Sequence, residues 1–580
     1  METIILSQKL YLRLIFISFL KKKKIYYINK SFLSKIIKLL KLSNIKKINW
    51  KIEDIKINNQ IILTEIIENK KVDNFVYKYL DQFKFEINEE KNFINYLVKF
   101  FSNHKCIGNF TVENFLVFFY ACNILFKEKN KIFYIDNSVF NFFIKKNFSD
   151  KNNKFKFVGI FDYNFFYILT YIIKKLLYGS FKNKNFINGQ YKIAVLDSYE
   201  INKPKLFFHN SFYENILFLS DKNNNQESNI INFYNYCSFF FLLFIIKTFF
   251  QSFLYIKKGS LINSLFVQFK FEEKIFYKIF KKFKVEKFMT CYVSQVFSSS
   301  AVSAIDKING SSYGFTMSFS EDYSSHVNID AYDNFFSFNN CNYIKTKNSK
   351  LKKIFNPGYI CDYKFKNKKT KAEELRYKLT SNGIKYVIGF FDQGYYADSM
   401  FQMGYHISDR GYQFLLNKIL THEDIGIIIK PKKPKIINLK LSNISNDLLE
   451  KAINSKKCIL LNDYAVHHVK NFEDIPAQVA MASDITIHDT LLAGTAALES
   501  ALVGCKSLMF DYYGAKQSLF NQNNLDIVYA DWNLLWAKII DDKNKQSNSG
   551  FGNWNKIIKK FDPYMDGRAN QRIIDILSNE

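Results

Sequence analysis

Residues 482–511 constrain the fold of this chain more than any other stretch. They begin with a β-branched run at 485–487, pass through polar and small residues to Thr495, and continue with strong helix formers. Gly504 then suits the position after a helix end, and a second apolar run begins at Ser507. The pattern predicts strand, turn, helix and strand, which is half of a nucleotide-binding α/β unit. Its polar atoms would lie at the carboxyl end of a strand and at a helix N-terminus, where open α/β sheets hold phosphates.

The length of the chain predicts more than one domain, because 580 residues exceed what a single hydrophobic core normally spans. From residue 286 onward, apolar runs of strand length alternate with helical stretches, which is typical of parallel βαβ units. We therefore predict an α/β protein with two Rossmann-like domains facing a cleft, and with extra N-terminal helices. The predicted parts are an N-terminal α/β domain at 1–362, a linker at 363–383, a second Rossmann-like domain at 384–560 and a C-terminal helix at 561–580.

The positive charge of the chain is concentrated in its first two-thirds. Of the 82 Lys and Arg and the 53 Asp and Glu residues, 381–580 holds 22 of each, so the net charge of +29 lies in 1–380. A basic region attracts anionic partners such as nucleic acid, an anionic membrane surface or an acidic acceptor. Arginine, the residue that most often contacts bases in forked geometry, is nearly absent, which disfavours nucleic acid. A solvated lysine-rich surface is the alternative interpretation.

Residues 238–256 form the most apolar stretch of the sequence. Lys247 lies at its centre, and a helix needs about 20 mostly apolar residues to span a membrane. We expect 238–256 to form a buried or interfacial helix, with a spanning helix as the alternative. This helix would belong to a helical, basic and membrane-facing part of the chain near 230–285. Met1 to Lys24 lacks the cleavage site of a signal peptide, and the eight cysteines include no C-x-x-C pair. The expected location is therefore the cytoplasm, at the inner face of the cytoplasmic membrane.

The turn and helix after the strand at 485–487 carry the first group of candidate binding residues. The backbone N–H groups of Gly494, Thr495 and Ala496, together with the Thr495 hydroxyl, can hold a phosphate at the helix N-terminus. The carboxylate of Glu499, on the helix itself, can accept both hydroxyls of a ribose. An ordinary surface glutamate beside a helix cap is the alternative interpretation.

Four further candidates lie at the carboxyl ends of predicted strands in the same domain. Lys430 and Lys432 belong to a Lys-Pro-Lys-Lys-Pro-Lys run and can neutralise a diphosphate, although a basic loop explains them equally well. His488 ends one strand, and Asp392 follows another, where its carboxylate can hydrogen-bond sugar hydroxyls.

A loop of the N-terminal domain gathers Glu321, Asp322 and His326 after a predicted strand. A general base must take a proton from an acceptor hydroxyl, and each of these side chains is able to do so. A hydrogen-bonded structural loop is the alternative interpretation. No Asp-x-Asp motif is evident in either candidate loop, so we expect no metal and no cofactor.

Two α/β domains with this motif in the second resemble the GT-B glycosyltransferases. Asp484-Ile-Thr-Ile and Gly494-Thr-Ala-Ala-Leu-Glu499-Ser-Ala-Leu-Val-Gly504 look like the turn, helix and following strand of that fold's donor domain. Other stretches look like bacterial surface-polysaccharide biosynthesis members, namely Gly358-Tyr-Ile, Phe390-Phe-Asp-Gln, Ile428-Ile-Lys-Pro-Lys-Lys-Pro434, Phe510-Asp-Tyr-Tyr-Gly-Ala-Lys516 and Asp562-Pro-Tyr-Met-Asp-Gly-Arg568. The resemblance covers roughly 286–580.

The resemblance implies a GT-B-like fold in which the second domain holds a nucleotide-sugar donor and the first holds the acceptor. Glu499 would match the ribose-binding glutamate of that family. Many retaining members carry another glutamate eight positions earlier, where this chain has Leu491, and this departure favours inversion with a base from the first domain. Independence of metals is usual for the fold.

The sequence therefore predicts a glycosyltransferase that moves a sugar from a nucleotide-sugar donor to a surface polysaccharide or a lipid-linked glycan acceptor, with inversion. Its expected partners are the donor, the acceptor and a peripheral membrane contact, without nucleic acid. Two alternatives stay open: a CDP-glycerol-type glycerophosphotransferase, and a non-catalytic partner in polysaccharide assembly or export.

Overall fold

The computed structural model describes most of the chain from residue 350 onward and shorter segments before it. The described residues are 3–7, 24–27, 45–48, 50–57, 60–61, 66, 96, 109–127, 129–135, 152–157, 163–181, 189–196, 207–208, 210–221, 229–237, 240–255, 260–290, 297–315, 331–338, 350–393, 404–461, 475–491, 494–512, 514–515, 519–522, 525–546 and 550–579.

The second domain contains a sheet of six parallel strands in the order β17-β16-β15-β18-β19-β20. Its strands are β15 Tyr386–Phe391, β16 Ile425–Lys430, β17 Cys458–Leu460, β18 Ile485–His488, β19 Lys506–Phe510 and β20 Val528–Tyr529. The chain starts in the middle at β15, builds outward to β17, and returns to build outward again from β18. The strand order therefore reverses between β15 and β18, as in doubly wound nucleotide-binding sheets.

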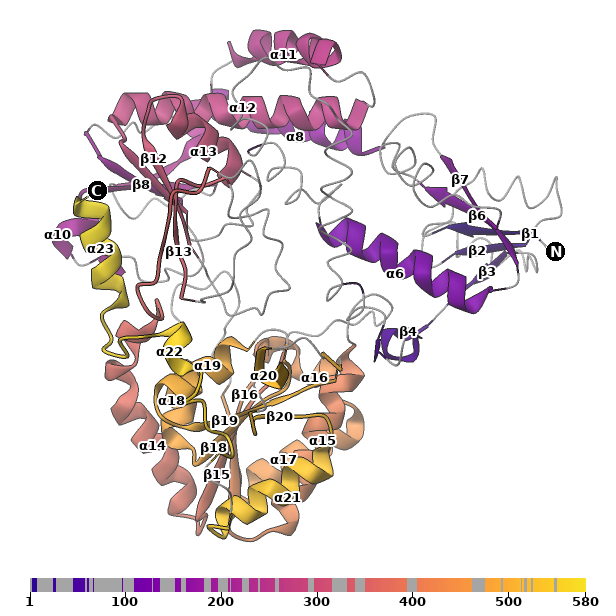
Figure 1. Ribbon diagram of the computed structural model, residues 1–580, viewed down its shortest axis with the longest axis vertical. Coiled ribbons are helices and arrows are strands. Elements are labelled where there is room, and N and C mark those ends of the chain that lie inside the picture. The colour runs from indigo at the N-terminus through magenta and orange to yellow at the C-terminus, as the bar shows by residue number, and fades with distance from the viewer. Residues whose placement is uncertain are drawn as a thin grey trace.

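Helices cover both faces of this sheet (Figure 1). They are α14 Lys369–Thr380, α15 Tyr405–Thr421, α16 Ile437–Lys440, α17 Asn443–Asn454, α18 Pro476–Ala482, α19 Thr495–Leu502, α20 Leu519–Gln522 and α21 Trp532–Lys543. Alternate residues of β15 enter different cores, because successive side chains of a strand point to opposite faces. Ile388 and Phe390 pack with α15 and α21, whereas Val387 and Phe391 pack with α14 and α18. The predicted linker, 363–383, thus contains a helix that packs on the second sheet.

The first domain contains seven parallel strands in the order β10-β9-β8-β11-β12-β13-β14. They are β8 Ile193–Leu196, β9 Ile216–Ser220, β10 Ile230–Asn232, β11 Lys287–Thr290, β12 Ser311–Phe315, β13 Asn334–Phe336 and β14 Lys353–Phe355. The order again reverses in the middle, between β8 and β11. These two sheets confirm the predicted α/β, GT-B-like class with two Rossmann-like domains.

The helices of the first domain include α8 Tyr163–Phe181, α10 Asn210–Tyr213, α11 Phe241–Tyr255, α12 Ser260–Phe283 and α13 Ser298–Asp306. The prediction of long helices over 230–285 is wrong at its start, where Ile230–Asn232 is strand β10 and Phe233–Tyr236 is a short 3-10 turn. A run of seven mostly apolar residues has no periodicity that separates strand from helix. Among the described residues, no helix is long and apolar enough to cross a membrane.

The N-terminal region adds a third parallel sheet that the sequence did not predict, with the order β3-β2-β1-β6-β7. Its strands are β1 Thr3–Ser7, β2 Ile25–Tyr27, β3 Ile45–Lys47, β6 Asn130–Ile135 and β7 Asn153–Phe157, and helix α6 is Asn109–Leu125. Residues 32–42, whose apolar side chains recur at helical spacing in the sequence, lie outside the described residues. Figure 1 shows this sheet at the right of the view, apart from the other two.

The chain crosses between the two Rossmann-like domains twice. After β14 it enters the second domain, and after α22 Ile558–Phe561, which contacts α19, helix α23 Ala569–Asn579 returns to the first domain (Figure 1). Asn570 Nδ2 donates to the carbonyl of Phe207 at 2.9 Å, and Lys287 Nζ donates to the carbonyl of Leu577 at 2.7 Å. Helix α23 therefore fixes the C-terminal segment to the first domain. The placing of the domain boundaries stays a prediction.

Candidate functional site

Polar residues gather where the strand order of the second sheet reverses. Asp392 and Gln393 follow β15. His488 is the last residue of β18, and Asp489 follows it. Neighbouring strand β16 ends at Lys430. Because parallel strands present their carboxyl ends at one edge, three loops that carry these groups meet at the position where such sheets bind ligands.

A buried ion pair between Asp392 and Lys440 supports this edge. Lys440 Nζ lies 2.7 Å from Asp392 Oδ2, and both side chains are fully buried. The same Asp392 oxygen accepts from the Tyr412 hydroxyl at 3.1 Å, and the other accepts from the backbone N–H of Lys432 at 2.5 Å. Lys440 also donates to the carbonyl of Gln393 at 3.1 Å. The carboxylate thus ties the end of β15 to α15, α16 and the loop after β16, while its predicted contact with sugar hydroxyls stays a prediction.

His488 is buried, with 4% of its surface exposed, at the end of β18. Among the described residues, no group hydrogen-bonds its Nδ1 atom. Burial, and secondarily the positive charge of Lys432, lower the pKa of the imidazole to about 3. The side chain is therefore neutral at physiological pH, and its contact with a donor stays a prediction.

Asp489 is fully buried beside His488. The Ser408 hydroxyl donates to its Oδ2 at 3.0 Å. Burial, together with the negative charge of Asp392, raises the pKa of the Asp489 carboxyl well above its usual range. This carboxyl therefore favours its neutral form in the folded protein.

Glu499 lies on α19 and joins segments from both domains. Its Oε1 accepts from the Tyr359 hydroxyl at 2.7 Å, and its Oε2 accepts from the backbone N–H of Ala477 at 3.1 Å. Tyr359 follows β14 of the first domain, whereas Ala477 belongs to α18 of the second. Burial raises the pKa of the carboxyl. Glu499 therefore has a bridging role that the sequence did not predict, and its contact with a ribose stays a prediction.

Helix α19 begins close to the position that the sequence predicts. Gly494 is the N-cap and is buried, while Thr495 and Ala496 begin the helix and are half-buried. Gly504, after the helix, has a φ of +83°, which is the left-handed conformation expected of a glycine there. Lys430 is half-buried, and the exposed ammonium of Lys432 donates to Gln393 Oε1 at 2.6 Å.

The predicted catalytic residues Glu321, Asp322 and His326 lie outside the described residues. Within the described ranges, no three His, Cys, Asp or Glu side chains form a group that could hold a metal ion. The sequence missed Lys440, Tyr412, Ser408 and Asp489 as members of the switch-point edge. Of these, only Asp489 carried a signal, because it directly follows the candidate His488.

No family model matches this sequence, and no curated protein matches it. Solved structures of similar fold include the following three. The wall teichoic acid polymerase TagF is 12% identical with a TM-score of 0.37, and the match covers 72% of this chain and 98% of that chain. The UDP-GlcNAc 2-epimerase from Neisseria meningitidis bound to UDP-GlcNAc is 12% identical with a TM-score of 0.39, and the match covers 67% of this chain and 99% of that chain. MurG from Acinetobacter baumannii is 8% identical with a TM-score of 0.39, and the match covers 67% of this chain and 100% of that chain. Identities of this size mark a likeness of fold and not of chemistry.

Proposed function

We propose that the protein is a glycosyltransferase that holds a nucleotide sugar at the switch-point edge of its second domain. The single observation that supports this proposal is the meeting of Asp392, Lys432, His488 and the Gly494 turn at one edge of a doubly wound sheet. Such an edge is where open α/β sheets take nucleotides. The acceptor in this proposal is a surface polysaccharide or a lipid-linked glycan on the first domain.

The diphosphate of the donor would bind between the N-terminus of α19 and the lysines after β16. The positive end of a helix dipole favours an anion, and the ammonium groups of Lys430 and Lys432 add charge. The buried Asp392–Lys440 pair keeps the loop that carries Lys432 in place, since the Lys432 N–H is bonded to Asp392. Binding would thus use groups already positioned by the fold.

His488 would act as a hydrogen-bond acceptor for the donor rather than as a base. Its imidazole is neutral because its pKa is lowered to about 3, and a base with so low a pKa takes up protons poorly near neutral pH. The base in this proposal is one of Glu321, Asp322 and His326.

The proposed reaction is a single displacement with inversion. The acceptor oxygen forms a bond to the anomeric carbon, the bond from that carbon to the donor phosphate oxygen breaks, and the hydroxyl proton passes to the base. The nucleoside diphosphate leaves with its added negative charge facing α19 and the lysines, which would stabilise the transition state. Leu491 is buried and apolar, so it supplies no second carboxylate for a two-step route.

Thermal unfolding of the full chain with UDP-, GDP- and CMP-sugars and with CDP-glycerol tests this proposal. Stabilisation by one of the nucleotide sugars is the expected result. Stabilisation by CDP-glycerol alone would replace the proposal with glycerophosphotransfer, and no stabilisation by any of these would contradict both. Binding of a nucleotide sugar without its turnover on membrane extracts would favour the non-catalytic assembly partner.

The substitution Lys432→Gln locates the donor. The side chain is exposed and its backbone N–H, not its ammonium, bonds Asp392, so the fold should be unaffected. Loss of one charged hydrogen bond to phosphate should weaken donor binding about ten-fold or more. Lys435→Gln, an exposed lysine of the same basic run, is the matched control and should bind normally. Equal affinity of the Lys432 variant and the native chain would remove this lysine from the site.

A further inference from the structure

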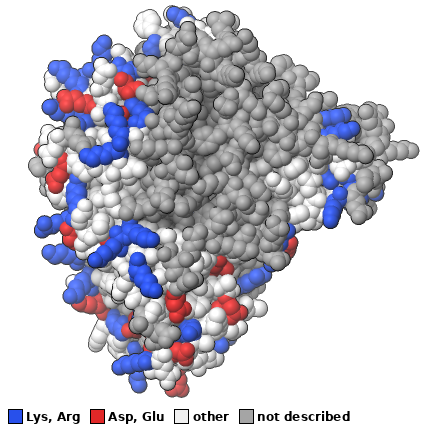
Figure 2. Space-filling view, viewed as in Figure 1, with Lys and Arg blue, Asp and Glu red and all other residues white. Residues whose placement is uncertain are grey.

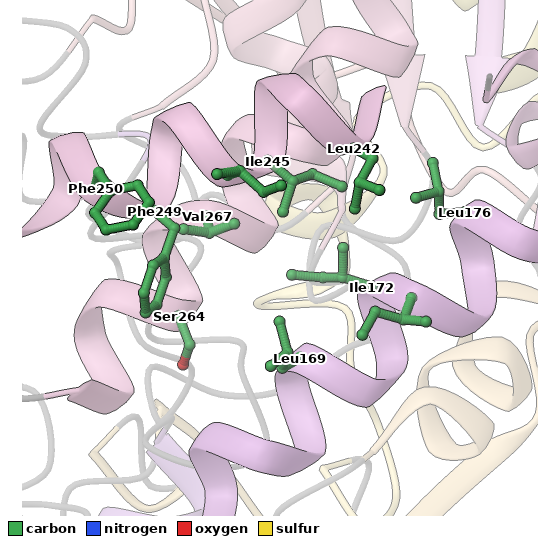
Figure 3. Close-up of a pocket in the computed structure, with 11 residues that line it drawn as sticks. Leu169, Ile172, Leu176, Leu242, Ile245, Phe249, Phe250, Ser264 and Val267 are labelled. Atoms are coloured by element: carbon green, nitrogen blue, oxygen red, sulfur yellow. The ribbon is translucent and has the colours of Figure 1, made fainter. Parts of the chain in front are cut away.

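A cavity of about 410 Å³ lies among helices α8, α11 and α12 of the first domain (Figure 3). Its lining is aliphatic and aromatic except for one serine, and includes Ile172, Leu176, Ile245, Phe249, Val267 and Ser264. Cavities lined in this way offer water few hydrogen bonds and take apolar ligands. The volume is within the range of pockets that hold small molecules.

The cavity reaches an exposed apolar face on α11. Phe240, which directly precedes α11, is 81% exposed, and Leu243 and Phe250 on the helix are 70% and 67% exposed. Leu243 and Phe250 are seven residues apart, so they lie on the same side of the helix. Ile246 and Phe250 both line the cavity and are exposed, as is Ile173 of α8, so the lining continues to the surface. Figure 1 shows α11 outermost above α12.

The charges around this face are of one sign. Lys174 of α8, Lys247 of α11 and Lys278 of α12 are exposed. In the described residues of the three helices the only carboxylates are Glu272 and Glu273, and both are buried. Lysines beside an apolar surface complement the negative surface potential of an anionic membrane.

We propose that α11 docks on an anionic membrane surface and that the cavity beneath it receives one hydrocarbon chain of a membrane phospholipid. At 15 residues, α11 is shorter than the roughly 20 that span a bilayer, so it would lie in the plane of the interface. The polar headgroup would remain among the exposed lysines while the chain enters the apolar lining. This site is separate from the donor site and does not depend on transfer activity.

Co-sedimentation of the full chain with vesicles tests the surface. The native chain should bind vesicles of phosphatidylcholine mixed with phosphatidylglycerol and bind phosphatidylcholine alone more weakly. Phe250→Asp should weaken binding about ten-fold or more, because it replaces an inserted aromatic group with a charge. Ile444→Asp is the matched control: this isoleucine is 60% exposed on α17 of the second domain, and its variant should bind like the native chain. Normal binding of the Phe250 variant, or none by the native chain, would overturn the proposal.

Native mass spectrometry of protein recovered from the same vesicles tests the cavity. The native chain should retain one phosphatidylglycerol, and Val267→Trp and Ile172→Trp, which fill the cavity from two different helices, should not. Overfilling can destabilise a core, so each variant is accepted only if its circular dichroism and unfolding midpoint stay near native. Retained lipid in a folded filled variant, or none in the native chain, would overturn the cavity assignment. Nucleotide-induced stabilisation is measured without lipid, so either proposal can fail alone.

Discussion

The two Rossmann-like domains place buried carboxylates in different surroundings. In the second domain, Asp392 is in contact with the ammonium of Lys440, and both side chains are fully buried. In the first, Glu272 is equally buried, but its hydrogen bonds come from the neutral side chains of Gln268 at 3.0 Å and Ser300 at 3.3 Å. Burial raises the pKa of Glu272 to about 7.

This difference arises although both sheets have the same doubly wound strand order. Topology decides where the carboxyl ends of strands meet, but the partners of each buried acid decide its charge. Burial disfavours the charged form of an acid, whereas a cation or a hydrogen-bond donor beside the acid favours that form. Figure 2 shows basic and acidic residues mixed over the second domain at the bottom of the view, consistent with its balanced composition.

The largest predicted loss of stability follows removal of the cation beside Asp392. Lys440→Met should lower the free energy of unfolding by about 3–5 kcal/mol, because it leaves a buried carboxylate without its counter-ion. Urea unfolding followed by tryptophan fluorescence measures this, since Trp532, Trp536 and Trp554 lie in the second domain. The double variant with Asp392→Leu should recover part of the loss. A single variant as stable as the native chain would show that the pair is dispensable.

A smaller change in stability should appear when the pH is varied, because the buried carboxyl of Glu272 titrates. Because its pKa is raised from 4.5 to about 7, its contribution is fully present below pH 4.5 and is lost as the pH rises through 7, by up to about 3 kcal/mol. Hydrogen exchange of α12 peptides should therefore become faster with rising pH beyond its intrinsic pH dependence. Glu272→Gln should remove this excess. Persistence of the excess in the variant would assign it to another group.

The interdomain bridge to Glu499 gives the next prediction. Tyr359→Phe removes one of the donors of a buried carboxylate and should cost about 1–3 kcal/mol. Thermal unfolding of the full chain measures the cost, and Tyr377→Phe, a tyrosine that is 71% exposed, is the control. If the bridge exists, Tyr359→Phe should cost much less in a Glu499→Gln background, because the two changes are coupled. Additive effects would contradict the contact.

Local patterns of the sequence predicted strands β15 to β19 of the second domain and the start of α19. The strands β15 and β16 are nearly continuous apolar runs, as is typical of strands buried on both faces. Gly504 was recognisable because a residue past a helix end often needs a positive φ. These features depend on neighbours along the chain, so sequence alone contains them.

The partners of the buried acids could not be predicted in the same way. Asp392 and Lys440 are 48 residues apart, and Tyr359 and Glu499 are 140 apart. Their contacts depend on how sheet, helices and domains pack, which no local period encodes. The role of Glu499 illustrates this: its position on α19 predicted a ligand contact, and packing added a bond to the other domain.

The smallest effect concerns Asp489, whose Oδ2 accepts from Ser408. Ser408→Ala should cost about 1 kcal/mol at neutral pH, the usual value of one hydrogen bond. The bond from Ser408 favours the ionised carboxyl, so its loss raises the Asp489 pKa further. A raised pKa withdraws stability as the pH rises through it, so the loss in the variant relative to the native chain should grow with rising pH. Urea unfolding over a series of pH values measures this trend.

Ser455→Ala, which removes a bond to the backbone carbonyl of Ala452, should lose the same amount throughout the series. A pH-independent loss for Ser408→Ala would mean that Asp489 behaves like an acid already paired with a cation, and the contrast between the two domains would then not extend to this residue.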